Sequence, residues 1–403
     1  MTKILSDRFN KILAPELLRN QNLYPFFRAI ESEQGTEVIL NGRKMLMFGS
    51  NSYLGLTTHP KVKAASEAAI KKYGSSAAGS RFLNGTTDLH IELESRLAKY
   101  LNKEAVLLYT TGFQVNLGVI PTITQPNDLI ILDRLDHASI IEGARLSKAP
   151  YVMFKHNDMV SLEQKLEQAE DAEMKLIVVD GVFSMEGDLA NLKGITELAK
   201  QYNAVVMSDC AHAIGVIGEY GAGAASHFDI EDQVDLIGGT FSKSLASIGG
   251  FIASNAPTIE YIKHNSRSLI FSASPTPAAV AAALASLDII ESDDSLRLKL
   301  LKNTQFAISK FKSLGFDIGN TETPIIPLYI RNDKKTHELA MLLLKRGIFV
   351  NSIAAPAVSR NNSMIRFSLM ATHTQEQIDL AIDTIYQCAK ELDVPLSLEA
   401  HEQ

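Results

Sequence analysis

Several polar side chains stand directly after short apolar runs in the middle of the sequence. Asp209 ends the run AVVMSD and His212 follows it, while Lys243 follows VDLIGGT and His137 follows LIILD. Ser184 comes shortly after the run KLIVVDG. Such runs are typical of strands buried on both faces of a parallel sheet, and ligands bind these sheets at the carboxyl ends of the strands. The sequence therefore predicts one site with a carboxylate, two imidazoles, an amine and hydroxyl groups.

This combination of groups suits the chemistry of pyridoxal phosphate (PLP). The amine of Lys243 can form a Schiff base, and the hydroxyls of Thr240 and Ser242 lie on the same glycine-rich turn, where they can bind a phosphate. The carboxylate of Asp209, on a neighbouring strand, can keep a pyridinium nitrogen protonated. A second phosphate-binding element is predicted at Gly112 and Phe113, where the strand-like run AVLLY gives way to a predicted helix over 114–120 with free amide groups.

Each of these features has a simpler explanation when it is taken alone. Lys243 could be a surface lysine, His137 a structural histidine, and the nearby hydroxyls ordinary turn residues. Asp209 and His212 could cap a helix or form half of a metal site. No further ligands at metal spacing accompany them, so we expect no metal. The prediction of a PLP site therefore rests on the combination.

The elements around these residues predict an α/β fold. Apolar runs alternate with amphipathic segments such as 159–169 and 192–202, which favours a sheet with helices on both faces. After Pro277 the pattern changes to a smaller α+β region, with helices predicted over 276–290, 295–314, 335–346 and 374–392 and strands over 325–330, 348–351 and 364–369. We expect an N-terminal segment (1–55) that packs on the small domain, a large cofactor domain (56–290) and a C-terminal small domain (291–403).

Composition excludes several other classes of protein. The 403 residues include 39 Lys and Arg against 46 Asp and Glu, a net charge of −7 that lacks the basic footprint of a nucleic-acid-binding protein. Two cysteines are too few for a disulfide scaffold, the N-terminus lacks a signal-peptide pattern, and no apolar run approaches the ~20 residues of a spanning helix. We expect a cytoplasmic protein. Transient association with a membrane surface is left open, although no polybasic signature supports it.

The motifs resemble those of the α-oxoamine synthases, a family of fold-type I PLP-dependent enzymes. The resemblance extends from about Asn20 to Leu392 and is carried by the runs NSYLGL (51–56), TGF (111–113), DHAS (136–139), SMEGD (184–188), DCAHAIG (209–215) and GTFSK (239–243). It implies a large, mostly parallel seven-stranded sheet domain with a smaller α+β domain. It also implies a homodimer with shared active sites.

The resemblance further implies roles for the residues around the cofactor. Lys243 would hold PLP and then remove the α-proton of the amino acid, and Asp209 would pair with the ring nitrogen. His212 would contact the phenolic oxygen of the ring, and His137 would stack on the ring face. The phosphate would be held by Gly112, Phe113, Thr240 and Ser242, aided by Ser272 of the partner subunit.

For the substrates, the resemblance assigns Arg366 to the amino-acid carboxylate and places Asn51 and Tyr53 near the substrate and a thioester. Ser184 would add a contact to cofactor or substrate. The runs AGSRFLNGT (78–86), FSAS (271–274), RFS (366–368) and ATHT (371–374) indicate the subgroup that condenses L-serine with a long-chain acyl-CoA. With palmitoyl-CoA, the products would be 3-ketodihydrosphingosine, CoA and CO₂, in the first step of sphingolipid synthesis.

Three alternatives remain open at this stage. Glycine C-acetyltransferase and 8-amino-7-oxononanoate synthase share many of the same motifs but use glycine or alanine. A non-catalytic partner subunit is a third alternative, although such subunits lack the Schiff-base lysine that this sequence carries as Lys243.

Overall fold

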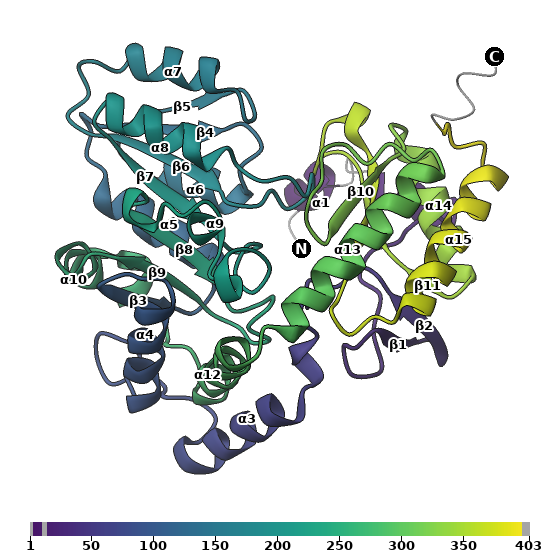
Figure 1. Cartoon of the computed structure of the whole chain (residues 1–403), viewed down its shortest axis with the longest axis horizontal. Helices are drawn as coiled ribbons and strands as arrows, with labels where there is room; N and C mark the ends of the chain where they lie inside the picture. Colours follow the sequence, from purple (N-terminus) through teal and green to yellow (C-terminus); the bar gives the residue numbers. More distant parts are fainter. Residues whose placement is uncertain (1–2, 10–13, 397–403) are drawn as a thin grey trace.

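A seven-stranded sheet forms the centre of the larger part of the molecule (Figure 1). The computed structural model describes residues 3–9 and 14–396. The strand order is β3-β9-β8-β7-β6-β4-β5, and β9 runs antiparallel to both of its neighbours. The strands are β3 (Ala105–Tyr109), β4 (Leu129–Asp133), β5 (Tyr151–Phe154), β6 (Lys175–Asp180), β7 (Ala204–Asp209), β8 (Leu236–Thr240) and β9 (Gly250–Ser254).

The strands form because both of their faces are covered. Ile177 of β6 packs in one hydrophobic cluster, while its neighbours Leu176 and Val178 pack in a second cluster on the opposite face. The covering helices are α3 (Pro60–Tyr73), α4 (Asp88–Tyr100), α5 (Gly112–Ile123), α6 (Ala138–Leu146), α7 (Met159–Glu167), α8 (Leu192–Gln201), α9 (Ala224–His227), α10 (Ala256–Asn265), α11 (Arg267–Ile270) and α12 (Pro277–Ser292). Three short 3₁₀ segments accompany them: η1 (Leu56–Thr58), η2 (Glu219–Gly221) and η3 (Glu231–Gln233).

Both ends of the chain contribute to the smaller part. One of its sheets contains β1 (Glu37–Leu40), β2 (Arg43–Met47) and β11 (Ile348–Phe349), and the other contains β10 (Ile325–Tyr329), β13 (Met364–Ser368) and β12 (Asn351–Ile353). The remaining elements are α1 (Lys3–Phe9), α2 (Ala14–Asn20), α13 (Ser295–Ser313), α14 (Asp333–Lys345), η4 (Arg360–Asn362) and α15 (Gln375–Glu391). Leu46 pairs with Ile348 in a parallel ladder, which joins the N-terminal strands to the C-terminal region.

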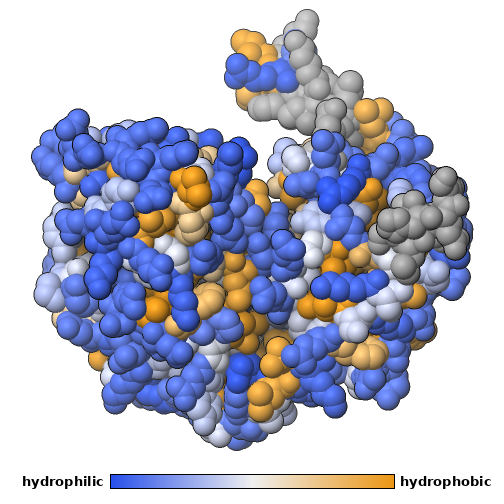
Figure 2. Space-filling model, turned by 45° about the horizontal axis from the view of Figure 1, so that its top comes forward, coloured by the Kyte–Doolittle hydropathy of each residue, from blue (hydrophilic) through white to orange (hydrophobic). Residues whose placement is uncertain are grey.

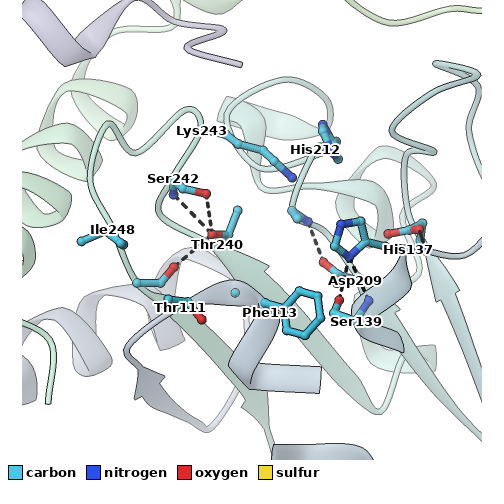
Figure 3. Close-up of a pocket in the computed structure, with 14 residues that line it drawn as sticks. Thr111, Phe113, His137, Ser139, Asp209, His212, Thr240, Ser242, Lys243 and Ile248 are labelled. Atoms are coloured by element: carbon cyan, nitrogen blue, oxygen red, sulfur yellow. Dashed lines mark hydrogen bonds between the residues drawn. The ribbon is translucent and has the colours of Figure 1, made fainter. Parts of the chain in front are cut away.

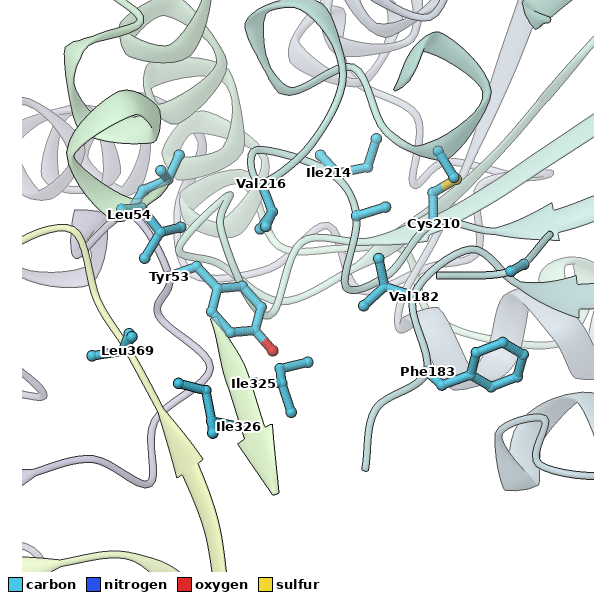
Figure 4. Close-up of a cluster of buried hydrophobic side chains, with 14 of the residues drawn as sticks. Tyr53, Leu54, Val182, Phe183, Cys210, Ile214, Val216, Ile325, Ile326 and Leu369 are labelled. Atoms are coloured by element: carbon cyan, nitrogen blue, oxygen red, sulfur yellow. The ribbon is translucent and has the colours of Figure 1, made fainter. Parts of the chain in front are cut away.

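The two parts meet through apolar side chains and one loop. Figure 4 shows Val182, Phe183 and Cys210 of the large part in one cluster with Tyr53 and Ile325. Hydrophobic residues also gather along the line where the two parts meet on the surface (Figure 2).

The loop after β6 extends to the small part. The carbonyl of Gly187 accepts hydrogen bonds from the hydroxyls of Thr323 (2.8 Å) and Thr321 (3.2 Å). A Cβ at position 187 would lie 2.0 Å from the carbonyl oxygen of Ile325, and φ is +71° there, so this contact requires glycine.

The predicted fold class is confirmed, with two corrections to its elements. The predicted strand 348–351 is two strands, because the chain leaves β2 after Phe349 and pairs with β13 from Asn351. The predicted helix 114–120 begins earlier, at Gly112, because Thr111 caps it. The domain limits near 55 and 290 remain a prediction. None of the helices in the described part of the chain combines the length and hydropathy that a bilayer-crossing helix requires.

Candidate active site

A cavity of about 320 Å³ opens at the carboxyl ends of the central strands (Figure 3). Eight of the residues predicted to contact a cofactor line it: Gly112, Phe113, His137, Asp209, His212, Thr240, Ser242 and Lys243. Further lining residues, for which no role was predicted, are Ser139, Asp180, Ala211, Ile248 and Gly249. The loops after β4, β7 and β8 therefore converge at one sheet edge as expected, whereas Ser184, from the loop after β6, does not line the cavity.

Lys243 presents its amine in this cavity from the loop after β8. Burial lowers the pKa of Lys243 to about 8, although the charges of Asp209 and Asp180 oppose the shift and the charge of Arg366 adds to it. A pKa near 8 leaves a useful fraction of the amine neutral at physiological pH, which a nucleophilic or proton-accepting lysine requires.

Asp209 ends β7 and is 7% exposed. Its Oδ1 accepts a hydrogen bond from the backbone N–H of Ala211 (3.0 Å), and its Oδ2 accepts one from Nδ2 of Asn116 (2.7 Å). Both oxygens thus have hydrogen-bond donors that fix the orientation of the carboxylate. The carboxylate is therefore held where it can form an ion pair with a cationic group in the cavity.

His137 caps the N-terminus of α6. Its Nδ1 accepts the backbone N–H of Ser139 (3.2 Å) and lies 2.7 Å from the Ser139 hydroxyl, so Nδ1 carries no proton and the neutral ring has its proton on Nε2. Burial lowers the pKa of His137, which agrees with a neutral ring. The ring also lies edge-on to Phe113, with centroids 6.1 Å apart.

The start of α5 and the turn after β8 together form a cradle suited to a phosphate. The first amides of α5 have no intrahelical acceptors, and Thr111 caps the helix by accepting from the N–H of Gln114 (3.1 Å). A Cβ at Gly112 would lie 2.6 Å from Cβ of Thr240, so the helix can approach the strand this closely only with glycine. The hydroxyl of Thr240 lies 2.9 Å from that of Ser242.

A buried amine, a strand-end carboxylate and an amide-rich anion cradle around one cavity are the groups that PLP requires. The residues present therefore fit the predicted cofactor.

The predicted substrate residues form a second group beside the cavity. Arg366 is 4% exposed and donates from Nε to the carbonyl of Ser184 (2.6 Å) and from Nη2 to the Tyr53 hydroxyl (3.4 Å). The Tyr53 hydroxyl lies 2.6 Å from Nδ1 of His212 and 3.3 Å from Oδ1 of Asn51. Ser184 thus contributes a carbonyl to Arg366. Burial raises the pKa of Tyr53 and lowers that of His212, so both groups are uncharged.

Ser272 does not line this cavity. Its hydroxyl accepts a hydrogen bond from Nε2 of Gln114 (2.7 Å) in the segment after α11. Its predicted role in the site of a partner subunit stays a prediction.

Sequence reasoning missed a set of carboxylates beneath the cavity. Asp136 accepts the backbone N–H groups of Asp133 (2.8 Å) and Asp180 (3.0 Å), which ties β4 to β6. Asp180 accepts the N–H of His137 (2.7 Å). Burial and neighbouring negative charge raise the pKa of both Asp136 and Asp180. The signal was available, because Asp133 and Asp180 end their strands as Asp209 ends β7.

His156 was also missed, and it fastens the loop after β6. Its Nδ1 lies 3.0 Å from Asp133 and its Nε2 lies 2.9 Å from Asp188. Burial opposes the charged ring, but hydrogen bonds to the two carboxylates outweigh burial and raise the pKa of His156 to about 10. Nothing near His156 in the sequence indicates these partners, which lie 23 and 32 residues away.

The fold and this site define a class of enzyme, and comparison with known proteins agrees. A family model described as aminotransferase class I and II matches residues 43–385. The chain therefore belongs to this family of fold-type I PLP-dependent enzymes and, within it, to the α-oxoamine synthases, as its motifs predicted.

More particular relatives carry the names of single activities. The serine palmitoyltransferase of Sphingobacterium spiritivorum is 51% identical over 97% of this chain and 98% of its own length. The 8-amino-7-oxononanoate synthase of Lysinibacillus sphaericus is 40% identical over 97% of this chain and 100% of its own length. A solved structure of SPT with PLP superposes with a TM-score of 0.94 at 32% identity, covering 97% of this chain and 100% of that one.

Proposed function

We propose that this chain is a PLP-dependent acyltransferase that condenses L-serine with palmitoyl-CoA. The products are 3-ketodihydrosphingosine, CoA and CO₂. The observation that carries the proposal is one cavity in which the buried amine of Lys243 and the carboxylate of Asp209 meet, in a chain 51% identical to a serine palmitoyltransferase.

When bound, PLP supplies an electron-withdrawing pyridinium ring that stabilises negative charge at the α-carbon of an attached amino acid. Asp209 would hold the proton of the ring nitrogen through its negative charge. His137 would stack on the ring face and exclude water there. Lys243 holds the cofactor and accepts the α-proton of L-serine at Nζ, because it is the one amine among the described residues that line the cavity.

Arg366 binds the serine carboxylate, for which a planar guanidinium is suited. Its Nε donates to the carbonyl of Ser184, its Nη1 to the hydroxyl of Ser368 and its Nη2 to the hydroxyl of Tyr53, which leaves one hydrogen on each Nη for the carboxylate. Tyr53 and Asn51 would lie near the thioester. His212, which is hydrogen-bonded to Tyr53 through Nδ1, would contact the phenolic oxygen of the ring.

Assembly and location belong to the same proposal. A homodimer would bring Ser272 of the partner subunit to the phosphate cradle. Both cysteines are free and buried, which supports a reducing cytoplasm. Association with a membrane during release of the lipid product is a separate question, which sedimentation with vesicles would answer.

The decisive experiment offers L-serine, glycine and L-alanine to the purified protein with acyl-CoA thioesters of different length and identifies the products by mass. We expect 3-ketodihydrosphingosine from serine and palmitoyl-CoA. Product from alanine with pimeloyl-CoA, and none from serine, would instead support an 8-amino-7-oxononanoate synthase, the activity of a relative 40% identical to this chain.

A further inference from the structure

Asn116 lies in the middle of α5 and connects two groups of the site. It is 1% exposed. Its Nδ2 lies 2.7 Å from Oδ2 of Asp209 and 2.8 Å from Oγ of Ser139. A carboxamide nitrogen carries two hydrogens and does not accept hydrogen bonds. Asn116 therefore donates one hydrogen bond to each neighbour.

The hydrogen bond from Asn116 to Ser139 decides which atom donates in the next hydrogen bond, between Ser139 and His137. Because the Ser139 oxygen accepts from Asn116, its own proton is free to go to Nδ1 of His137, 2.7 Å away. Nδ1 also accepts the backbone N–H of Ser139, so it cannot be a donor. The chain of donors therefore runs from Asn116 through Ser139 to His137, and it leaves the proton of the neutral ring on Nε2.

The orientation of the amide is set by its neighbour Asp209. In the opposite orientation, Oδ1 of Asn116 would lie against Oδ2 of Asp209, and two acceptors would face each other. In the observed orientation, Oδ1 of Asn116 is buried without a partner. Leaving a buried acceptor unpaired is costly, and a hydrogen bond to a charged carboxylate is strong enough to offset it.

The backbone holds Asn116 firmly in this place. A Cβ at Gly143 of α6 would lie 2.6 Å from the carbonyl oxygen of Asn116, so the two helices are in close backbone contact there. The side chain thus reaches Asp209 from a position that cannot shift easily.

We propose that Asn116 is a positioning residue that fixes the orientation of the Asp209 carboxylate and keeps His137 in its neutral Nε2–H form. Asp209 and His137 are the groups that would meet the nitrogen and the face of the PLP ring, so this inference rests on the proposed function. One amide then sets the orientation of the carboxylate at the ring edge and the proton position at the ring face.

Other titratable groups face the same cavity and must be separated from Asn116. They include Asp180 of β6 and Lys243 from the loop after β8. His137 and His212 face the same cavity but are uncharged. The dissociation constant of PLP is therefore always compared as a ratio of variant to wild type. The contributions of these other groups largely cancel in that ratio.

The test measures the dissociation constant of PLP from the apoprotein between pH 6 and pH 8. For Asn116→Leu, which has similar volume and no donor, we expect binding weaker by about tenfold at pH 8, the order expected for a lost hydrogen bond to a charged group. The ratio to wild type should grow further towards pH 6, because the His137 ring, whose pKa burial lowers, loses the Asn116–Ser139 chain that keeps its Nδ1 unprotonated. A ratio that stays near one, or is the same at every pH, would overturn the inference.

Two control variants keep the result interpretable. Ser139→Ala removes only the branch to His137 and leaves the hydrogen bond to Asp209, so its PLP affinity at pH 8 should stay near wild type and only the pH-dependent part of the loss should appear. Asn303→Leu removes another buried amide, which donates to the carbonyls of Met370 and His373 in the small part, and it should lower stability without altering PLP affinity. If Asn116→Leu does not fold, Asn116→Ala replaces it with the same expected pH dependence.

The experiment distinguishes a failure of the role of Asn116 from a failure of the proposed function. If the wild-type protein fails to bind PLP or to make product from serine, the proposed function fails. If the wild type does both and Asn116→Leu matches it across the pH range, only the role of Asn116 fails.

Discussion

The two halves of the active site are built differently. The half that faces the cofactor is held within the large part, where Lys243, Asp209 and His137 stand just after the ends of central strands. The half assigned to the substrates joins Arg366 of β13 and Tyr53 of the N-terminal segment to the large part, through the carbonyl of Ser184 and the ring of His212. Cofactor binding therefore depends on one part of the molecule, whereas serine binding depends on the contact between both.

The largest effect is expected from Lys243→Ala. Removing the amine should lower turnover by about 10³-fold or more, because the group that holds the cofactor also moves the proton. PLP affinity should fall much less, because the phosphate cradle and Asp209 remain. Product formation by mass and PLP titration give the two values, and a variant with full turnover would disprove the role of Lys243.

The same lysine predicts a pH dependence of cofactor capture. Only the neutral amine reacts, and the pKa of Lys243 is lowered to about 8 by burial. The rate at which the apoprotein takes up PLP should therefore rise about fivefold between pH 7 and pH 8 and level off above pH 9. Stopped-flow absorbance measures this rate. A profile that still rises steeply above pH 10 would contradict the lowered pKa.

Arg366→Lys tests the half of the active site that is assigned to the substrates. A lysine keeps the charge but loses the planar pair of donors, so the KM for serine should rise about 10- to 100-fold. PLP affinity should stay within about twofold of wild type if the two halves are independent. A large loss of PLP affinity would show that the halves are not separable.

His156→Asn tests the loop that joins the halves. The variant loses a charged hydrogen bond on each side of the ring, and the free energy of unfolding should fall by about 2 kcal/mol at pH 7. The pKa of His156 is raised in the folded protein to about 10, so its contribution is complete below pH 6.5 and is lost as the pH rises through 10. Denaturant unfolding at pH 7, 9 and 10.5 should show the difference between wild type and variant shrinking, and a constant difference would refute the assignment.

The smallest effect is expected from Tyr53→Phe. The hydroxyl connects His212 with Arg366, and its loss should lower kcat/KM for serine about three- to tenfold, as for a neutral hydrogen bond. PLP affinity should fall by less than this factor. An equal fall in both would place Tyr53 in the cofactor half instead.

The cofactor half could be predicted from the sequence because its residues are tied to strand ends, and a strand end is visible as the end of an apolar run. Asn116 lies inside a helix, where nothing local indicates which neighbour its amide meets. His156 depends on Asp133 and Asp188, whose proximity arises only when three loops come together. For the fold, β5 was missed although its residues YVMF are apolar, because a run of only four residues between a proline and a lysine is a short signal. The division at Val350 depends on which strand each segment pairs with, and that is a tertiary property.

The pairing of β2 with β11 has a consequence for how the chain matures. About 300 residues separate Leu46 from Ile348, so the first hairpin leaves the ribosome long before the strand that covers its free edge. At ~5–20 residues per second, synthesis leaves that edge without its native neighbour for roughly 15 to 60 seconds. During that interval Val38, Leu40 and Met45, buried in the finished protein, lack most of their covering. The hairpin is thus a segment of the nascent chain whose apolar side chains a chaperone could cover until β11 is made.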